Sequence, residues 1–261
     1  MSLSNPMAFF DVSNKVALIT GASGAFGAVA AECLSGAGCR VALAAGNTDA
    51  MASVASQCKN DTVQIKGRPD SEQACDELVA KTVKAFGRLD ILVVASGMNK
   101  VAKIEDMPPE TFTDVMDANV TQSWMMARAA TRQMKAQGDG GKIVLMSSAR
   151  GLLGHPAGYT AYCASKSAVD GITKALGCEL GPSGITVNAI APTVFRSPLT
   201  AWMFADDEQA TAVRNGFLSR VPKGRLGEPE DLAGPLLFLS SAASDFYTGH
   251  ILYADGGYTA G

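Results

Sequence analysis

The chain has 261 residues, of which 47% are hydrophobic and 18% charged, a composition typical of one folded domain rather than a disordered chain. Its net charge is −3 and no run of lysine or arginine forms a basic stripe, so we expect no nucleic-acid partner. The N-terminus lacks a cationic, apolar leader, and charged residues interrupt the most apolar stretch (29–45), so we expect neither a signal peptide nor a membrane span.

Short apolar runs alternate with helical stretches along the chain. The expected strands are 15–20, 40–44, 62–66, 90–95, 142–147, 186–191 and 251–253. The expected helices are 28–35, 48–58, 71–86, one long helix over 108–137, then 162–180 and, after an irregular insert, 229–239. Continuous apolar strands separated by helices predict a parallel sheet that is covered on both faces. We therefore expect one doubly wound α/β domain, with ligands at the carboxyl ends of its strands.

A glycine-rich turn follows the first expected strand and leads into the first expected helix. Residues 20–27 read Thr-Gly-Ala-Ser-Gly-Ala-Phe-Gly. A strand, a glycine turn and a helix in this order are the setting of a dinucleotide-binding fingerprint. The glycines let the backbone approach a pyrophosphate, and the helix N-terminus supplies free N–H groups. We expect the dinucleotide to contact Gly21, Ser23, Gly24, Ala25, Phe26 and Gly27.

Tyr162 and Lys166 lie four residues apart at the start of an expected helix, so their side chains share one helical face. A nearby ammonium favours the phenolate and lowers the pKa of a tyrosine. The pair can therefore exchange a proton with a carbonyl or an alcohol. This spacing also occurs by chance in many helices, so the pair by itself identifies no function. Tyr159 is not the partner of a lysine in this way, because position 163 is a cysteine.

The glycine turn, Asn119, Ser148 and the Tyr162–Lys166 pair occur in an order that resembles the short-chain dehydrogenase/reductase family. The resemblance extends from about residue 15 to the C-terminus and is greatest to the gluconate 5-dehydrogenase branch. It implies a single-domain Rossmann fold, usually with seven strands, and NAD(P)-dependent hydride transfer between a nicotinamide and a carbonyl or alcohol. It also implies a homotetramer.

The resemblance assigns a role to each of the four polar residues. Tyr162 would protonate the carbonyl oxygen or deprotonate the alcohol, and Lys166 would lower its pKa and bind the nicotinamide ribose. Ser148 would orient the substrate oxygen, and Asn119 would hold a water that relays protons to Lys166. Ser148 precedes Tyr162 by fourteen residues where the family commonly has thirteen, which implies one extra loop residue.

The end of the second expected strand bears on the choice of cofactor. An acidic residue there would bind the ribose 2′-hydroxyl of NAD, and residues 44–48 contain none. This favours NADP(H) over NAD(H), with Asn47 bonding the 2′-phosphate and Arg68 stacking on adenine or pairing with that phosphate. The alternative for Arg68 is a solvated loop residue. The resemblance adds contacts from Gly97, Pro192 and Val194.

We expect residues 193–217 to form a lid over a small-molecule substrate. Arg150 and Arg196 are candidates to bind a substrate carboxylate. The alternative for either is an ion pair between lid and body. As carboxylate-binding candidates, Arg150 and Arg196 suggest, together with the resemblance, a sugar acid or polyol as substrate. A 3-oxoacyl-thioester reductase and a non-catalytic dinucleotide-sensing module remain alternatives.

The six cysteines have no Cys-x-x-Cys spacing, and the two histidines cannot pair in a metal site. We therefore expect reduced thiols, no metal and a cytoplasmic protein.

Overall fold

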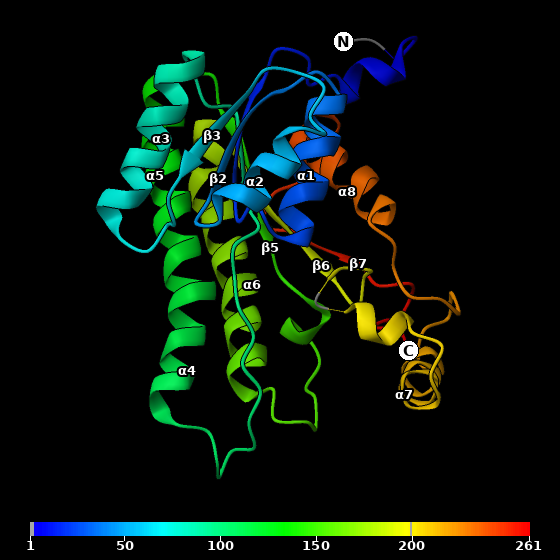
Figure 1. Ribbon diagram of the computed structural model, residues 1–261. Helices are drawn as coiled ribbons and strands as arrows, with labels where there is room; N and C mark the ends of the chain where they lie inside the picture. The colour runs from blue at the N-terminus through cyan, green and yellow to red at the C-terminus, as the bar shows by residue number, and fades with distance from the viewer. Residues whose placement is uncertain (1–2, 199) are drawn as a thin grey trace.

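A single seven-stranded parallel sheet forms the centre of the molecule (Figure 1). The computed structural model describes residues 3–198 and 200–261. The strands run in the spatial order β3-β2-β1-β4-β5-β6-β7. They are β1 (Val16–Thr20), β2 (Arg40–Ala45), β3 (Thr62–Lys66), β4 (Ile91–Val94), β5 (Gly141–Met146), β6 (Ile185–Pro192) and β7 (Ile251–Ala254). The strand order reverses between β1 and β4, which confirms the predicted doubly wound Rossmann fold and places its ligand crevice at that reversal.

Helices cover both faces of the sheet. The helices are α1 (Ala25–Gly36), α2 (Thr48–Ala55), α3 (Glu72–Phe86), α4 (Pro109–Met116), α5 (Gln122–Gln137), α6 (Thr160–Leu180), α7 (Glu208–Leu218) and α8 (Glu230–Ser240). Of these, α4 packs on α6 and α7 on η5 (Ala201–Phe204) rather than on the sheet. Short helical turns are η1 (Pro6–Phe10), η2 (Asp117–Thr121), η3 (Ala149–Gly151), η4 (Gly181–Ser183), η5 (Ala201–Phe204) and η6 (Ala242–Ser244). One apolar cluster joins the sheet to α3, α5 and α6, and a second joins its other face to α1, α2 and α8 (Figure 1).

Successive residues of the inner strands β1, β2, β4 and β5 enter opposite clusters, which explains why these strands are apolar without alternation. Leu18 packs in the cluster under α3, α5 and α6, whereas Ala17 and Ile19 pack in the cluster under α1, α2 and α8. All three side chains are fully buried. A strand buried on both faces gains from apolar side chains at every position.

Two segments differ from the sequence-based expectation. The long helix expected over 108–137 contains a π-helical turn, η2, between α4 and α5. The insert expected to be irregular contains η5 and the three-turn helix α7, for which the Asp207 side chain accepts a hydrogen bond from Ala210 N at 2.8 Å. Asp207 followed by Glu208 is a helix-start signal that the sequence reading did not use.

All six cysteines are free thiols. Within residues 3–198 and 200–261, no helix is long and apolar enough to cross a membrane.

Candidate active site

Ser148, Tyr162 and Lys166 meet where β5 ends and α6 begins. The Lys166 Nζ donates to the Met146 carbonyl at 2.7 Å and lies 5.5 Å from the centroid of the Tyr162 ring. The Ser148 hydroxyl interacts with the Tyr162 side chain and donates to the Pro192 carbonyl at 3.4 Å. The neighbouring Ser147 hydroxyl donates to Asp170 Oδ1 at 2.5 Å instead. The fold therefore brings Ser148, the serine chosen from the sequence, to the tyrosine.

Asn119 lies in the π-helical turn and is 1% exposed. Its Oδ1 accepts from Met98 N at 2.7 Å, and its Nδ2 donates to the Met98 carbonyl and to Ser165 Oγ, each at 2.9 Å. A Cβ added to Gly97 would lie 2.7 Å from Asn119 Oδ1 and 4.0 Å from Lys166 Nζ, so the three groups are neighbours. A π turn re-aims side chains locally, as functional sites often require. The water relay through Asn119 stays a prediction.

Burial has the largest effect on the pKa values of Lys166 and Tyr162. Loss of hydration lowers the pKa of Lys166 to about 8, with the Asp170 charge acting weakly in the other direction. Loss of hydration also raises the pKa of Tyr162, and the interaction with the Ser148 side chain opposes this only in part. For the protein by itself the net shift of the Tyr162 pKa is therefore upward, because desolvation of the phenolate is the largest effect, and the lowering expected from Lys166 stays a prediction.

The glycine turn has the close packing that a dinucleotide cradle requires. Gly21 has a φ of +65°, and a Cβ there would lie 2.5 Å from Ser96 N, which follows β4. A Cβ on Gly27 would run into the backbone of Gly21 and Ala22. Helix α1 therefore begins directly above β1, and its first N–H groups have no partner within the helix. This turn at the β1–β4 reversal fits a pyrophosphate.

Asn47 and Arg68 lie together beyond β2 and β3. The Asn47 Oδ1 accepts from Ala50 N at 3.0 Å and caps α2. Arg68 lies against Gly46, where an added Cβ would be 2.5 Å from Arg68 Nε. Its side chain has no hydrogen bond or ion pair to any other residue that the structure describes. Arg68 thus stands free at the strand end where the ribose 2′ position is read.

The remaining candidate cofactor contacts lie on the same edge of the sheet. Gly97 follows β4 and is exposed, and Pro192 is the last residue of β6. The Val194 carbonyl accepts from Gly227 N at 3.0 Å. Contact of any of these residues with a dinucleotide stays a prediction.

Both arginines predicted to bind substrate make contacts within the protein. Arg196 pairs with Glu228 through two hydrogen bonds of 2.8 and 3.1 Å, and it lies 3.9 Å over the Phe204 ring. This is the lid-to-body ion pair that was its alternative. Arg150 donates to the Gly154 carbonyl at 2.8 Å and to the Tyr258 hydroxyl at 2.9 Å. For both residues a substrate contact stays a prediction.

Sequence reasoning missed two buried groups that support the site. Ser165 links Asn119 to α6, since its hydroxyl accepts from Asn119 and donates to the Tyr162 carbonyl at 2.8 Å. Asp170 holds Ser147, and burial raises the pKa of its carboxyl. Asp170 follows Lys166 by four residues, and this spacing on one helical face is the signal that could have found it.

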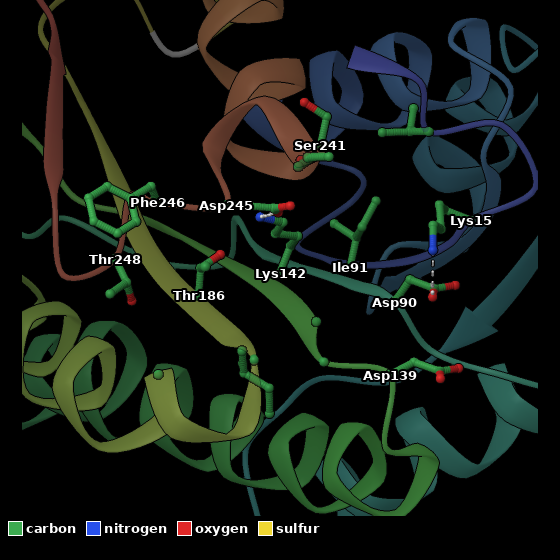
Figure 2. A pocket seen from close by; sticks show the side chains of 18 of the residues that line it. Lys15, Asp90, Ile91, Asp139, Lys142, Thr186, Ser241, Asp245, Phe246 and Thr248 are labelled. Carbon is green, nitrogen blue, oxygen red and sulfur yellow. Dashed lines mark hydrogen bonds and ion pairs between the residues drawn. The ribbon is translucent and has the colours of Figure 1, made fainter. Parts of the chain in front are cut away.

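A cavity of about 720 Å³ lies at the opposite edge of the sheet, at the amino ends of the strands (Figure 2). Figure 2 shows the ion pairs Lys15–Asp90 and Lys142–Asp245 beside it. Of the described residues that line it, none is a predicted site residue, so this cavity is separate from the proton-transfer group. Among the described residues, no three His, Cys, Asp or Glu side chains are grouped to hold a metal ion.

Comparisons with known proteins agree with this geometry. The family model described as enoyl-(acyl carrier protein) reductase matches residues 21–259. An uncharacterized oxidoreductase of Mycobacterium tuberculosis is 49% identical over 97% of this chain and 94% of its own length. The 3-oxoacyl-[acyl-carrier-protein] reductase of Rickettsia bellii is 36% identical over 95% of this chain and 98% of its own length.

Solved structures extend the comparison. A short-chain type dehydrogenase/reductase from Mycobacterium marinum has a TM-score of 0.90 and 36% identity, covering 98% of this chain and 99% of that one. A gluconate 5-dehydrogenase from Burkholderia cenocepacia, solved in complex with NADP and tartrate, has a TM-score of 0.90 and 28% identity, with the same coverage.

Proposed function

This chain belongs to the short-chain dehydrogenase/reductase family of NAD(P)-dependent enzymes, and we propose that it interconverts a secondary alcohol and a ketone on a sugar acid or polyol. The observation that carries the proposal is the contact of Ser148, Tyr162 and Lys166 at the carboxyl end of β5. The same edge of the sheet carries the glycine turn that fits a dinucleotide.

Each residue of the group has a chemical task. A bound nicotinamide dinucleotide supplies or accepts the hydride. Tyr162 donates its phenolic proton to the substrate oxygen during reduction and takes that proton back during oxidation. The phenol is protonated at neutral pH, as a donor must be, but the raised pKa of Tyr162 in the protein by itself makes it a weak acid, so efficient transfer requires that pKa to fall toward neutrality. Ser148 donates a hydrogen bond to the same substrate oxygen. Asn119 and Lys166 relay protons from solvent to Tyr162.

NADP(H) is the preferred cofactor in this proposal. No acidic side chain lies at the end of β2, and the free Arg68 guanidinium lies against Gly46 there. A phosphate at the ribose 2′ position would gain a charge-assisted hydrogen bond from Arg68. Residues 193–217, with α7, act as the lid that closes over the substrate.

The structural likeness to a gluconate 5-dehydrogenase supports the sugar-acid class. The 36% identical relative that reduces a 3-oxoacyl carrier protein supports the second candidate, a 3-oxoacyl-thioester reductase. Substrate class varies widely on this fold, so activity has to separate the two candidates.

The test is nicotinamide absorbance with gluconate and 5-ketogluconate, several polyols and an acetoacetyl thioester, each with NADP(H) and NAD(H). We expect turnover of the gluconate pair, faster with NADP(H), and a loss of about 10²- to 10⁴-fold in kcat for Tyr162→Phe. Turnover of the thioester alone would establish the second candidate. A protein that binds the dinucleotide but turns over no member of the panel would favour a sensing module.

A further inference from the structure

Two arginines from distant parts of the chain approach one buried tyrosine. Tyr258 is 1% exposed and stacks on Phe217 at 5.1 Å between ring centroids. The Arg220 guanidinium carbon lies 4.5 Å from the Tyr258 ring centroid, and that of Arg150 lies 5.4 Å from it. A guanidinium stacked on a ring, as that of Arg220 is, keeps its in-plane N–H groups available to another ligand. Both cations thus contact the same tyrosine, and we call them the Arg150–Arg220 pair.

No carboxylate neutralises this pair within the described residues. The side-chain hydrogen bonds of Arg150 go to the Gly154 carbonyl and the Tyr258 hydroxyl, both of which are uncharged. The Arg220 guanidinium has neither a hydrogen bond nor an ion pair among residues 3–198 and 200–261. By contrast, Arg196 and Arg225 each have a carboxylate partner. Two positive charges on one tyrosine without a carboxylate partner favour the binding of an anion.

The pair lies beside the proton-transfer group. His155 contacts Tyr159 at 4.4 Å between ring centroids, and Tyr159 contacts Tyr162 at 6.3 Å. Burial lowers the pKa of His155, and the charges of Arg150 and Arg220 lower it further, so both cations act at this end of the aromatic row. Arg150 follows Ser148 in the chain, and Arg220 follows the lid helix α7. The pair thus borders the reacting centre on one side.

We propose that Arg150 and Arg220 together bind the carboxylate of the substrate and select a hydroxy or keto acid over a neutral polyol. Two planar guanidiniums match the two oxygens of a carboxylate. Because Arg220 directly follows the lid helix α7 and Arg150 lies in the segment after β5, the bound anion would also hold the end of the lid to the body. This inference rests on the proposed function and narrows its substrate class to acids.

The test is calorimetric binding of gluconate and of glucitol, its uncharged counterpart, to the enzyme–NADPH complex, in which no turnover occurs. We expect the wild type to bind gluconate at least about tenfold more tightly than glucitol. Arg220→Gln should reduce this preference by about tenfold or more, and Arg220→Lys, which keeps the charge, should reduce it less. Arg132→Gln is the matched control, because Arg132 pairs with Glu72 and Asp76 on the surface of α3 and α5.

Equal binding of gluconate and glucitol by the wild type, or an unchanged preference in Arg220→Gln, would overturn the proposal. Binding of inorganic phosphate but not of gluconate to the enzyme–NADPH complex would also overturn the proposal, because the anion recognised by the two arginines would then be a phosphate group. A wild type that binds gluconate tightly yet oxidises it with neither cofactor would contradict the proposed function and leave the anion site standing. Arg220 is exposed, so melting temperatures should confirm that its variants fold.

Discussion

Lys166 carries its ammonium in a site from which water is excluded, with the Met146 carbonyl as its hydrogen-bond acceptor. Its pKa is lowered to about 8, while burial raises the pKa of Tyr162. Both shifts have the same cause, since a low-polarity site disfavours whichever form is charged. The site therefore keeps Tyr162 as a proton donor and makes Lys166 a group that titrates near neutral pH, at a cost in stability.

Replacing Lys166 by methionine should stabilise the fold at pH 7. A pKa of about 8 against the ordinary 10.5 corresponds to a penalty on the order of 3 kcal/mol, and the lost hydrogen bond to Met146 offsets about 1 kcal/mol of the gain. Between pH 8 and 10.5 the unfolded chain binds the proton and the native one does not, so wild-type stability rises with pH in this window.

Chemical denaturation at pH 7 and at pH 10, with equal protein concentrations, measures this effect. The stability difference between Lys166→Met and wild type should be largest at pH 7 and shrink by pH 10. An equal difference at both pH values would mean that the pKa of Lys166 is not lowered in the native state.

Arg68→Ala should weaken NADPH binding and leave NADH binding nearly unchanged. The variant loses one charge-assisted hydrogen bond to the 2′-phosphate, which corresponds to an affinity loss of about ten- to a hundredfold. Fluorescence titration with both reduced dinucleotides measures it. Lys59→Ala, which removes an exposed cation near the opposite end of β3, is the control. If Arg68→Ala leaves NADPH affinity unchanged, Arg68 is a solvated loop residue.

At the scale of elements, the contact between α1 and β1 sets the width of the dinucleotide turn. Gly27 lies in the first turn of α1, directly over Gly21 and Ala22. Any side chain there meets backbone atoms, which cannot rotate away as a flexible side chain can. The helix and the strand are therefore held at a separation that only glycine permits.

Gly27→Ala should push α1 away from β1. Its Cβ would lie 2.7 Å from Ala22 Cα and still closer to the Gly21 carbonyl, so we expect a loss of about 1–3 kcal/mol in stability. NADPH affinity should fall by about tenfold or more, since the N–H groups of α1 move with the helix. Thermal unfolding and NADPH titration measure the two effects.

Gly36→Ala, at the other end of the same helix, is the control, because no described atom lies within 4 Å of its Cβ. It should be neutral or stabilising by up to about 1 kcal/mol. Equal behaviour of the two variants would show that the close approach at Gly27 does not matter for binding.

At the scale of the whole molecule, four exposed aromatic side chains lie on two separate regions, in addition to Trp202 on η5. Phe112 and Trp124 lie on α4 and α5, which stand beside α6 in Figure 1. Phe246 and Tyr247 lie just before β7. Exposed aromatic side chains are compatible with surfaces that bind another protein where they form a contiguous patch. Two such surfaces on one subunit are what a tetramer built on perpendicular twofold axes needs, so a homotetramer stays our expectation.

Trp124→Glu should convert a tetramer into a dimer, because it replaces an aromatic contact by a charged carboxylate that loses its hydration at one of the two contacts. Light scattering should give four times the subunit mass of 27.0 kDa for the wild type and twice that mass for the variant. Val213→Glu on α7 is the control, since Val213 and Trp124 are both 44% exposed. A wild-type monomer would contradict the expectation.

Local sequence patterns were sufficient for most of the fold. The range expected for β3 is that observed, and Ser71 caps α3 as its position before that helix indicates. Strand burial on both faces, turn glycines and helix caps act over a few residues, so they are readable from the chain alone. The π turn at Asn119 was not readable, because it depends on bonds to Met98 and Ser165 from other elements.

The sequence by itself determined the family, the parallel sheet and the residue types of the proton-transfer group, because each is written in short motifs with fixed spacing. Only the tertiary structure decided how those residues behave. Burial depth sets the pKa values of Tyr162 and Lys166, and it results from packing against distant segments. The same is true of the two guanidiniums at Tyr258, since Arg150 and Arg220 are seventy positions apart and only the fold makes them neighbours.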